Sequence, residues 1–332
     1  MRNLAIIGGG SWGTALAAVL APRFPRVRLW VYESDLAARM GSSRENDIYL
    51  PGVQLPAQVL VTSDLAIALE DATIVLSVMP SHLVRVLYQQ MLPFLNESMV
   101  FVSATKGLEN GSLLRMSEVI REVLRPSFDP HVVVISGPTF AREVARFEPT
   151  ALVVAATGEA LPCAVQAAFS GPTFRLYTST DSIGVEIGGS IKNVVAIGAG
   201  VLNGMGLGHN ATAALITRGL AEMNRLALAM GGRPQTLAGL AGLGDLVLTC
   251  TGDLSRNRAV GVALAHGRKL DEIVNSMKMV AEGIKTTHAA VDLARRYEVE
   301  MPISEQMFQM LHFGVSPRDA IQRLMERSLK GE

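Results

Sequence analysis

Two charged residues in the second half of the chain lie in unusually apolar sequence. Lys192 follows Gly188–Ile191 at the start of an apolar, helical segment, and Asp245 is embedded in Gly242–Leu248. A buried carboxylate needs a compensating partner, and Lys192 is the natural one; capping a helix N-terminus is the alternative for Asp245. Desolvation can tune a lysine for proton transfer, although a long side chain can instead reach water. The two residues therefore predict a proton-transfer site.

A hydroxyl, a guanidinium and an amide stand side by side in Ser255-Arg256-Asn257, at the expected start of a helix that runs to His266. The first turn of a helix favours anions through its N–H groups and its dipole, and a guanidinium binds phosphate with two parallel hydrogen bonds. Surface capping alone would explain Ser255 but not the Arg-Asn pair. We therefore expect a phosphate group at this helix start.

The motif Gly8-x-Gly10-x-x-Gly13 follows an apolar, strand-like run and opens a helical pattern. In that context the glycines permit a tight turn and let backbone N–H groups reach a pyrophosphate. The alternative is a tight strand-to-helix turn without a ligand. The motif predicts a dinucleotide site.

Glu33 lies 20 residues after Gly13, at the end of the second expected strand. An acidic residue there can accept a hydrogen bond from the adenosine ribose, which would favour NAD over NADP. The carboxylate could equally be only solvated, and Tyr32 or Arg28 could contact the adenosine or a 2′-phosphate. The cofactor preference is therefore open at this stage.

Three short loops follow further expected strands: Met79–His82, Ala104–Gly107 and Ser136–Ala141. Open α/β sheets bind ligands at the carboxyl ends of their strands, where these loops must lie. Lys106 could contact substrate or cofactor, or it could be only solvated. The third loop combines Gly, Pro and small side chains that let a ligand approach, although an ordinary turn would look the same.

The first half alternates short apolar runs with helical patterns, which indicates βαβ units and a largely parallel sheet covered by helices on both faces. The expected strands are Leu4–Ile7, Val27–Tyr32, Thr73–Met79, Met99–Ser103, Val132–Ile135 and Ala151–Ala155. From Ser182 onward nearly every segment repeats at helical spacing. We therefore predict an α/β dinucleotide-binding domain over residues 1–181 and an all-helical substrate-binding and catalytic domain over residues 182–332.

The composition excludes several classes of protein. Of the 332 residues 49% are hydrophobic and 18% charged, which is incompatible with disorder, and thirty basic side chains balance thirty acidic ones. We therefore expect no nucleic acid and no membrane surface as partner. Cys163 and Cys250 are too few for a disulfide framework or the usual zinc site, and Val194–Leu202 is too short to span a membrane. A cytoplasmic protein without a metal is the expectation.

Several motifs together resemble the bacterial NAD(P)-dependent glycerol-3-phosphate dehydrogenase family along nearly the whole chain. Some of these motifs are shared with other two-domain dehydrogenases: Gly8–Ala15, Ala104–Gly107, Ser136–Ala141 and Lys192–Val194. Others are specific to the family: Gly242–Leu246, Thr249–Thr251 and Ser255–Asn257. The resemblance implies a Rossmann-type doubly wound domain, an all-α domain, and reversible reduction of dihydroxyacetone phosphate to sn-glycerol 3-phosphate, the backbone precursor of phospholipids.

The resemblance also implies roles for individual residues. Lys192 would be the proton donor and acceptor, with Asp245 as its catalytic partner. The NAD or NADP contacts would be Gly8, Gly10, Ser11, Trp12, Gly13, Tyr32, Lys106, Ala141, Arg256, Val280 and Glu282. The substrate contacts would be Lys106, Gly137, Thr139, Lys192, Asp245, Ser255, Arg256 and Asn257. Some members carry His or Arg where this chain has Tyr32, which leaves the adenosine phosphate contact in doubt.

Two other functions compete with this one. A β-hydroxyacid or ketoacid reductase would keep the glycine motif and a catalytic lysine, but it would need an arginine placed for a carboxylate. A regulatory protein that senses NAD without turnover would have no use for the pair of Lys192 and Asp245. The sequence does not fix the oligomeric state, for which a homodimer is one candidate.

Overall fold

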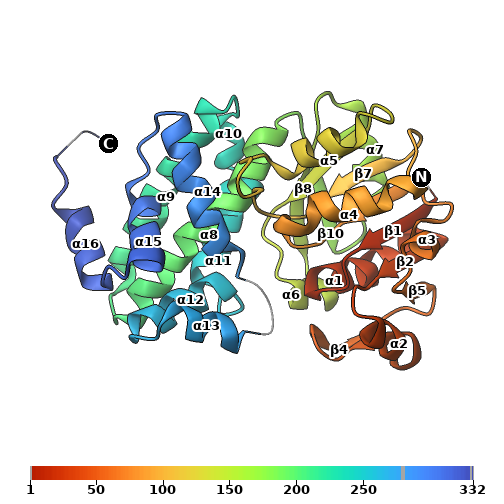
Figure 1. Cartoon of the computed structure of the whole chain (residues 1–332), viewed down its shortest axis with the longest axis horizontal. Helices are drawn as coiled ribbons and strands as arrows, with labels where there is room; N and C mark the ends of the chain where they lie inside the picture. Colours follow the sequence, from red (N-terminus) through yellow and green to blue (C-terminus); the bar gives the residue numbers. More distant parts are fainter. Residues whose placement is uncertain (1, 278–280, 330, 332) are drawn as a thin grey trace. The chain divides into compact units, whose positions relative to one another are not determined.

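The computed structural model (Figure 1) describes residues 2–277, 281–329 and 331, and it divides into two compact units. Unit 1 comprises residues 1–109 and 114–186, and unit 2 comprises residues 110–113 and 187–332. The border between them falls inside helix α8 (Ser182–Gly204), after Glu186, whereas the sequence predicts a boundary just before this helix. Each unit is described below by itself.

Unit 1 is built on an eight-stranded sheet with the order β10-β9-β8-β7-β6-β1-β2-β5. The strands are β1 (Asn3–Ile7), β2 (Arg26–Trp30), β5 (Val59–Thr62), β6 (Ile74–Ser77), β7 (Val100–Ser103), β8 (His131–Ser136), β9 (Thr150–Ala155) and β10 (Phe174–Ser179). All neighbouring strands are parallel except β8 and β9. The predicted α/β class with a largely parallel sheet is confirmed.

Two apolar cores cover the two faces of this sheet. Alternate residues of β1 belong to different cores, because successive side chains of a strand point to opposite faces. Leu4 and Ile6 join one core, and Ala5 and Ile7 join the other. The first core contains residues from α1 (Ser11–Leu20), α2 (Ser34–Ser43), α6 (Ala141–Ala145) and α7 (Ala160–Phe169); the second contains residues from α3 (Leu65–Leu69), α4 (Val84–Met91) and α5 (Met116–Leu124).

The strands β5 and β10 and the two-stranded antiparallel pair of β3 (Glu45–Asn46) and β4 (Leu50–Gln54) are absent from the predicted strands. Both β5 and β10 lie at edges of the sheet, where one side of the strand faces solvent. Their exposed residues, such as Leu60 and Tyr177, interrupt the burial pattern. A search for continuous apolar runs therefore misses them.

The described residues of unit 2 are helical and contain no strand. Beyond α8 the helices are α9 (His209–Ala229), α10 (Pro234–Leu237), α11 (Asp245–Thr251), α12 (Arg256–Ala265), α13 (Leu270–Ser276), α14 (Glu282–Arg296), α15 (Pro302–Phe313) and α16 (Pro317–Met325), and a π-helix, η4 (Leu240–Gly244), precedes α11. Among the described helices α8 is long and apolar enough to cross a bilayer, and its most apolar window is completely buried by the protein itself. Core helices of globular proteins meet the same criteria.

Glycines let α8 approach its neighbours closely in unit 2. A Cβ atom on Gly188 would lie 2.4 Å from the carbonyl oxygen of Ala241, and a Cβ atom on Gly261 of α12 would lie 1.9 Å from that of Ile197. No larger residue fits at either position without moving backbone. These contacts bring α8, which carries Lys192, against η4, which directly precedes Asp245, and against α12, which begins at Arg256.

Candidate active site

The glycine turn between β1 and α1 has the backbone that a dinucleotide site needs. A Cβ atom on Gly13 would lie 1.8 Å from the carbonyl oxygen of Gly8, so the helix can begin this close to the strand only with glycine. Gly10 is the N-cap of α1 and provides no side-chain cap, and Ser11 and Trp12 form the first turn. A helix N-terminus without a side-chain cap suits a pyrophosphate. The turn therefore fits the cofactor that the sequence predicts.

A buried asparagine that the sequence analysis did not single out supports this turn. The amide nitrogen of Asn46 donates to the carbonyl oxygen of Gly9 and to the hydroxyl of Thr14, each at 2.8 Å. Asn46 and Thr14 are both completely buried. Asn46 comes from the β3–β4 pair, far along the chain from the glycines. No local pattern marks it, because its role depends on tertiary contacts alone.

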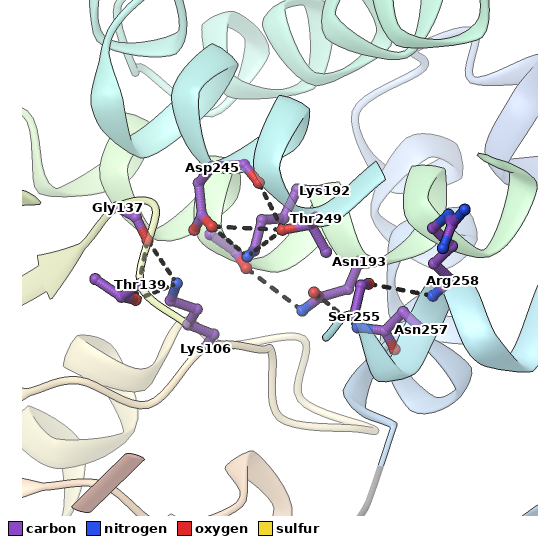
Figure 2. Close-up of polar contacts among 11 residues, drawn as sticks. Lys106, Gly137, Thr139, Lys192, Asn193, Asp245, Thr249, Ser255, Asn257 and Arg258 are labelled. Carbon is purple, nitrogen blue, oxygen red and sulfur yellow. Dashed lines mark hydrogen bonds and ion pairs between the residues drawn. The ribbon is translucent and has the colours of Figure 1, made fainter. Parts of the chain in front are cut away.

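Lys106 follows β7 and lies against the loop that follows β8. Its ammonium nitrogen is 2.9 Å from the carbonyl oxygen of Gly137 and 3.4 Å from the hydroxyl of Thr139 (Figure 2). Ala141 begins α6 just beyond this loop, and its N-cap, Phe140, offers no side-chain cap. Lys106 is thus held in place rather than freely solvated. The structure brings two predicted loops together at the carboxyl edge of the sheet.

In unit 2 the predicted pair of Lys192 and Asp245 is confirmed. The ammonium nitrogen of Lys192 lies 2.5 Å from Oδ1 of Asp245, and both residues are buried (Figure 2). Asp245 is the first residue of α11 and is not the N-cap, a position that Gly244 takes. Lys192 is only 6% exposed, so its ammonium does not extend into water. Both alternatives considered from the sequence are therefore wrong.

Thr249 completes this cluster. Its hydroxyl accepts a hydrogen bond from Lys192 at 2.8 Å and lies 2.5 Å from the backbone oxygen of Asp245, to which it donates. Thr249 follows Asp245 by four residues, so both side chains lie on the same face of α11. In the sequence, Thr249 is marked only by the motif Thr249–Thr251. Its spacing from Asp245 is the signal that could have identified it.

The predicted phosphate residues lie at the start of α12. Ser255 is the N-cap, and its hydroxyl accepts from the backbone N–H of Arg258 at 3.2 Å, as the sequence predicts. Arg256 follows as the first helical residue and is exposed. Partial desolvation lowers the pKa of its guanidinium, and the charge of Glu282 opposes this shift. The side chain of Arg258 is held by Asp253 at 3.0 Å. The helix start can therefore offer N–H groups and the guanidinium of Arg256 to an anion.

Asn257 connects three helices of unit 2. Its Oδ1 accepts from the backbone N–H of Gly283 at 2.9 Å, and its Nδ2 donates to Oδ1 of Asn193 at 2.9 Å. This places Asn257 between α8 and the first turn of α14, which begins at Glu282. Asn193 directly follows Lys192. The remaining predicted cofactor residue of this region, Val280, lies outside the residues that the structure describes.

The last predicted cofactor contact, Tyr32, lies just beyond β2 and is 76% exposed. Its ring meets that of Trp30 edge to face, with 6.1 Å between the ring centroids. The described residues contain no group of three or more His, Cys, Asp or Glu side chains that could hold a metal ion. The site residues described above are suited to proton transfer by a buried lysine, to anion binding and to dinucleotide binding.

A doubly wound sheet with this glycine turn and an all-helical unit with a buried lysine–carboxylate pair define a two-domain NAD(P)-dependent dehydrogenase. Comparison with known proteins narrows this class. Residues 3–161 match the family model described as NAD-dependent glycerol-3-phosphate dehydrogenase N-terminus, and residues 181–322 match the corresponding C-terminus. The chain therefore belongs to the NAD-dependent glycerol-3-phosphate dehydrogenase family.

Individual relatives agree with this result. The chain is 58% identical over 329 residues to the glycerol-3-phosphate dehydrogenase (NAD(P)+) of Koribacter versatilis, covering 98% of each chain. It is 53% identical over 331 residues to that of Citrifermentans bemidjiense, covering 100% of this chain and 99% of the relative. A 2.1 Å crystal structure of glycerol-3-phosphate dehydrogenase from Coxiella burnetii has a TM-score of 0.92 and 41% identity, covering 98% of this chain and 99% of that one.

Membership of the family gives the reaction. The chain is an NAD(P)-dependent oxidoreductase that reduces dihydroxyacetone phosphate to glycerol 3-phosphate, a step of lipid metabolism. Its partners are accordingly small-molecule substrates. Neither the ketoacid reductase nor the NAD-sensing protein considered from the sequence accounts for these matches over both halves of the chain.

Proposed function

We propose that Lys192 is the proton donor for reduction of the C2 carbonyl of dihydroxyacetone phosphate. The observation that carries this proposal is the buried ion pair of Lys192 with Asp245 at 2.5 Å. Asp245 keeps the lysine side chain charged where burial alone would favour its neutral form. Thr249 accepts a second hydrogen bond from the ammonium and thereby fixes its direction. Together the two contacts hold the ammonium in the position from which we propose that it protonates the substrate oxygen.

The electron balance of the reaction assigns one task to this cluster. Reduced nicotinamide, when bound, supplies a hydride to C2, and the π electrons of the carbonyl move onto its oxygen. Lys192 transfers a proton to that oxygen as negative charge develops on it. In the reverse direction the neutral lysine accepts the proton of the C2 hydroxyl. The Asp245 side chain, 2.5 Å from the ammonium, stabilises the charged form of the lysine.

We assign the phosphate of the substrate to the start of α12. The N–H groups of the first turn, the helix dipole and the Arg256 guanidinium all favour a dianion. Binding energy at this non-reacting group orients the carbonyl for hydride transfer. The remaining substrate contacts in this proposal are Lys106, Gly137, Thr139, Ser255 and Asn257, together with Lys192 and Asp245.

We assign the dinucleotide to the glycine turn, with Gly8, Gly10 and Gly13 shaping the backbone and Ser11 and Trp12 in the first turn of α1. Two observations support this assignment. The N-terminus of α1 has no side-chain cap, and Gly13 allows the helix to begin close to the carbonyl oxygen of Gly8. Further cofactor contacts in this proposal are Tyr32, Lys106, Ala141, Arg256, Val280 and Glu282. Unit 1 is thus the dinucleotide-binding domain, and unit 2 is the substrate-binding and catalytic domain.

For the location of the enzyme we propose the cytoplasm. Cys163 and Cys250 are both free thiols, and Cys163 is exposed. An unpaired, exposed thiol is compatible with a reducing compartment. Cell fractionation with an antibody against the chain tests this proposal: recovery with the cytoplasmic fraction supports it, and recovery with an oxidising compartment or a membrane pellet contradicts it.

For the assembly we propose a homodimer. Leu228, Phe313 and Met325 of unit 2 are each more than half exposed, and association would cover such apolar surface. Light scattering should give twice the 35.4 kDa mass of one chain. A mass of one chain at micromolar concentration contradicts the proposal.

A single assay tests the assigned chemistry. The rate of coenzyme oxidation is measured with dihydroxyacetone phosphate, with dihydroxyacetone and with simple 2-ketoacids, using NADH and NADPH in turn. We expect rapid turnover only with dihydroxyacetone phosphate, because only this substrate uses both the phosphate site and the proton donor. Faster turnover of a ketoacid would contradict the assignment of the substrate phosphate to α12.

A further inference from the structure

The carboxylate of Glu33 at the end of β2 is held by a side chain from a distant segment. The hydroxyl of Tyr49 donates to Oε1 of Glu33 at 2.7 Å. Glu33 is the N-cap residue of α2, yet its side chain does not cap the helix. The carboxylate is thus directed by Tyr49 rather than by the helix that it precedes. Its second oxygen, Oε2, accepts no hydrogen bond within the described part of the chain.

The same segment is tied to the glycine turn. The backbone N–H of Tyr49 donates to Oδ1 of Asn46 at 2.9 Å, and the amide nitrogen of Asn46 donates to the carbonyl oxygen of Gly9 at 2.8 Å. A continuous chain of hydrogen bonds therefore runs from the glycine turn through Asn46 and Tyr49 to Glu33. This chain fixes the carboxylate relative to the turn assigned to the pyrophosphate, all within unit 1.

Arginines near the end of β2 are already engaged with other groups. Arg28 donates to the backbone oxygen and to Oε2 of Glu70, the latter at 2.7 Å. Arg44 donates to the backbone oxygens of Pro56 and Val59. The six residues from Tyr32 to Ala37 contain two carboxylates, Glu33 and Asp35, and no basic side chain.

We propose that Glu33, positioned by Tyr49, gives this chain a preference for NADH over NADPH. Oε2 would accept a hydrogen bond from the free 2′-hydroxyl of the adenosine ribose in NADH. In NADPH the 2′-oxygen carries a phosphate and has no proton to donate. A 2′-phosphate would instead place two negative charges beside Glu33 and Asp35, and the segment from Tyr32 to Ala37 contains no basic side chain to balance them. Repulsion by two carboxylates outweighs the attraction of the α2 N-terminus, which carries only about half a positive charge. The preference rests on the assignment of the dinucleotide to unit 1.

Binding to the unmodified enzyme tests the preference without turnover. The dissociation constants of ADP-ribose and of its 2′-phosphate derivative are measured by calorimetry. We expect ADP-ribose to bind about tenfold more tightly, because one analogue gains a hydrogen bond where the other meets like charge. Equal binding, or tighter binding of the 2′-phosphate derivative, overturns the proposal. Failure of the proposed function would appear differently, as absence of turnover of dihydroxyacetone phosphate with either coenzyme.

Two substitutions test the roles of the two residues. Glu33→Gln should lower the ratio of kcat/KM with NADH to kcat/KM with NADPH about tenfold, mainly through the KM values of the coenzymes. Tyr49→Phe keeps the ring but removes the hydroxyl, so it should lower the same ratio by a smaller factor, roughly threefold. If the role of Tyr49 were purely structural, Tyr49→Phe would change kcat/KM with NADH and kcat/KM with NADPH by the same factor, and their ratio would stay constant.

Matched controls are available on the surface of unit 1. Glu97→Gln and Tyr177→Phe make the same chemical changes at exposed positions, outside the hydrogen-bond chain described above. Both should leave the ratio unaltered. A ratio that stays constant in Glu33→Gln overturns the proposal, and a ratio that stays constant only in Tyr49→Phe overturns the positioning role of Tyr49.

Discussion

The ammonium nitrogen of Lys192 lies 2.5 Å from Oδ1 of Asp245, and the two side chains are only 7% and 1% exposed. Two charges this deeply buried are costly to desolvate and persist only with good geometry and additional hydrogen bonds. Thr249 provides such a bond at 2.8 Å. A chain that needed only stability could place apolar residues here. The proposed role in proton transfer explains why the chain keeps a buried ion pair here.

Thr249→Val should lower kcat roughly tenfold and leave the KM of the coenzyme unchanged, because the ammonium of Lys192 loses a hydrogen-bond acceptor that fixes its direction. The pH profile of kcat should shift as well, which a merely structural defect would not cause. Steady-state kinetics from pH 6 to pH 10 provide both readouts. Thr251→Val is the matched control, since Thr251 is exposed and its hydroxyl donates to the backbone oxygen of Val247, away from Lys192.

Arg256→Ala should raise the KM for dihydroxyacetone phosphate and also lower kcat, because binding energy at the phosphate orients the reacting carbonyl. Arg256→Lys should restore activity only in part, since an ammonium cannot reproduce two parallel hydrogen bonds. Arg258→Ala is a control two residues further along the same helix.

Dihydroxyacetone, which lacks the phosphate, shows whether Arg256→Ala loses activity through the phosphate site or through the cofactor or folding. It should be a very poor substrate for the unmodified enzyme and nearly insensitive to Arg256→Ala. If the variant loses equal activity toward both substrates, Arg256 acts on the cofactor or on folding, and the phosphate assignment is wrong.

Glu222 of α9 should make the stability of the protein fall as the pH rises. Its buried carboxylate accepts hydrogen bonds from the backbone N–H groups of Ile303 and Ser304 at the start of α15. Burial nevertheless raises the pKa of Glu222 to about 7 from an ordinary value of 4.5. Between these values the folded state holds a proton that the unfolded state has released, so stability is lost as the pH rises through this window.

The loss should amount to about 3 kcal/mol between pH 4.5 and pH 7.5. Glu222→Gln is neutral at every pH and lacks this contribution. The difference in unfolding free energy between Glu222→Gln and the unmodified protein should therefore grow with pH, as measured by urea unfolding. Glu97→Gln, at an exposed position, should show a flat difference. A flat difference for Glu222→Gln would show that the hydrogen bonds from α15 compensate fully for burial.

Features with a local signature could be predicted from the sequence. The glycine turn, the buried central strands and the N-cap at Ser255 each depend on residues close together in the chain. Lys192 and Asp245 are far apart in the sequence. Their pairing could still be inferred, because each charge stands in an apolar segment and needs a partner of opposite charge.

Features that depend on tertiary contacts could not be predicted in this way. Asn46 and Tyr49 lie in an ordinary turn-rich segment, and nothing near them in the sequence indicates that they bond Gly9 and Glu33. The antiparallel pairing of β8 with β9 could not be predicted either, because both strands are apolar and their sequences do not indicate the direction of pairing. The edge strand β10 alternates buried and exposed residues and so lacks the continuous apolar run of the central strands.

Lys192→Ala tests the assignment of the proton donor. The variant lacks the ammonium that pairs with Asp245, so we expect kcat to fall by a factor on the order of a hundred or more. Coenzyme affinity should barely change, because the glycine turn belongs to unit 1. Lys269→Ala, which removes an exposed lysine at the start of α13, is the matched control and should retain full activity.

The most direct measurement is kcat of Lys192→Ala at saturating NADH and dihydroxyacetone phosphate, expressed per coenzyme-binding site counted by titration. Counting sites removes any contribution from unfolded protein. The proposed mechanism predicts normal binding stoichiometry with a kcat reduced about a hundredfold or more. A variant that binds coenzyme normally and turns over at the rate of the unmodified enzyme would contradict the assignment of Lys192 as the proton donor.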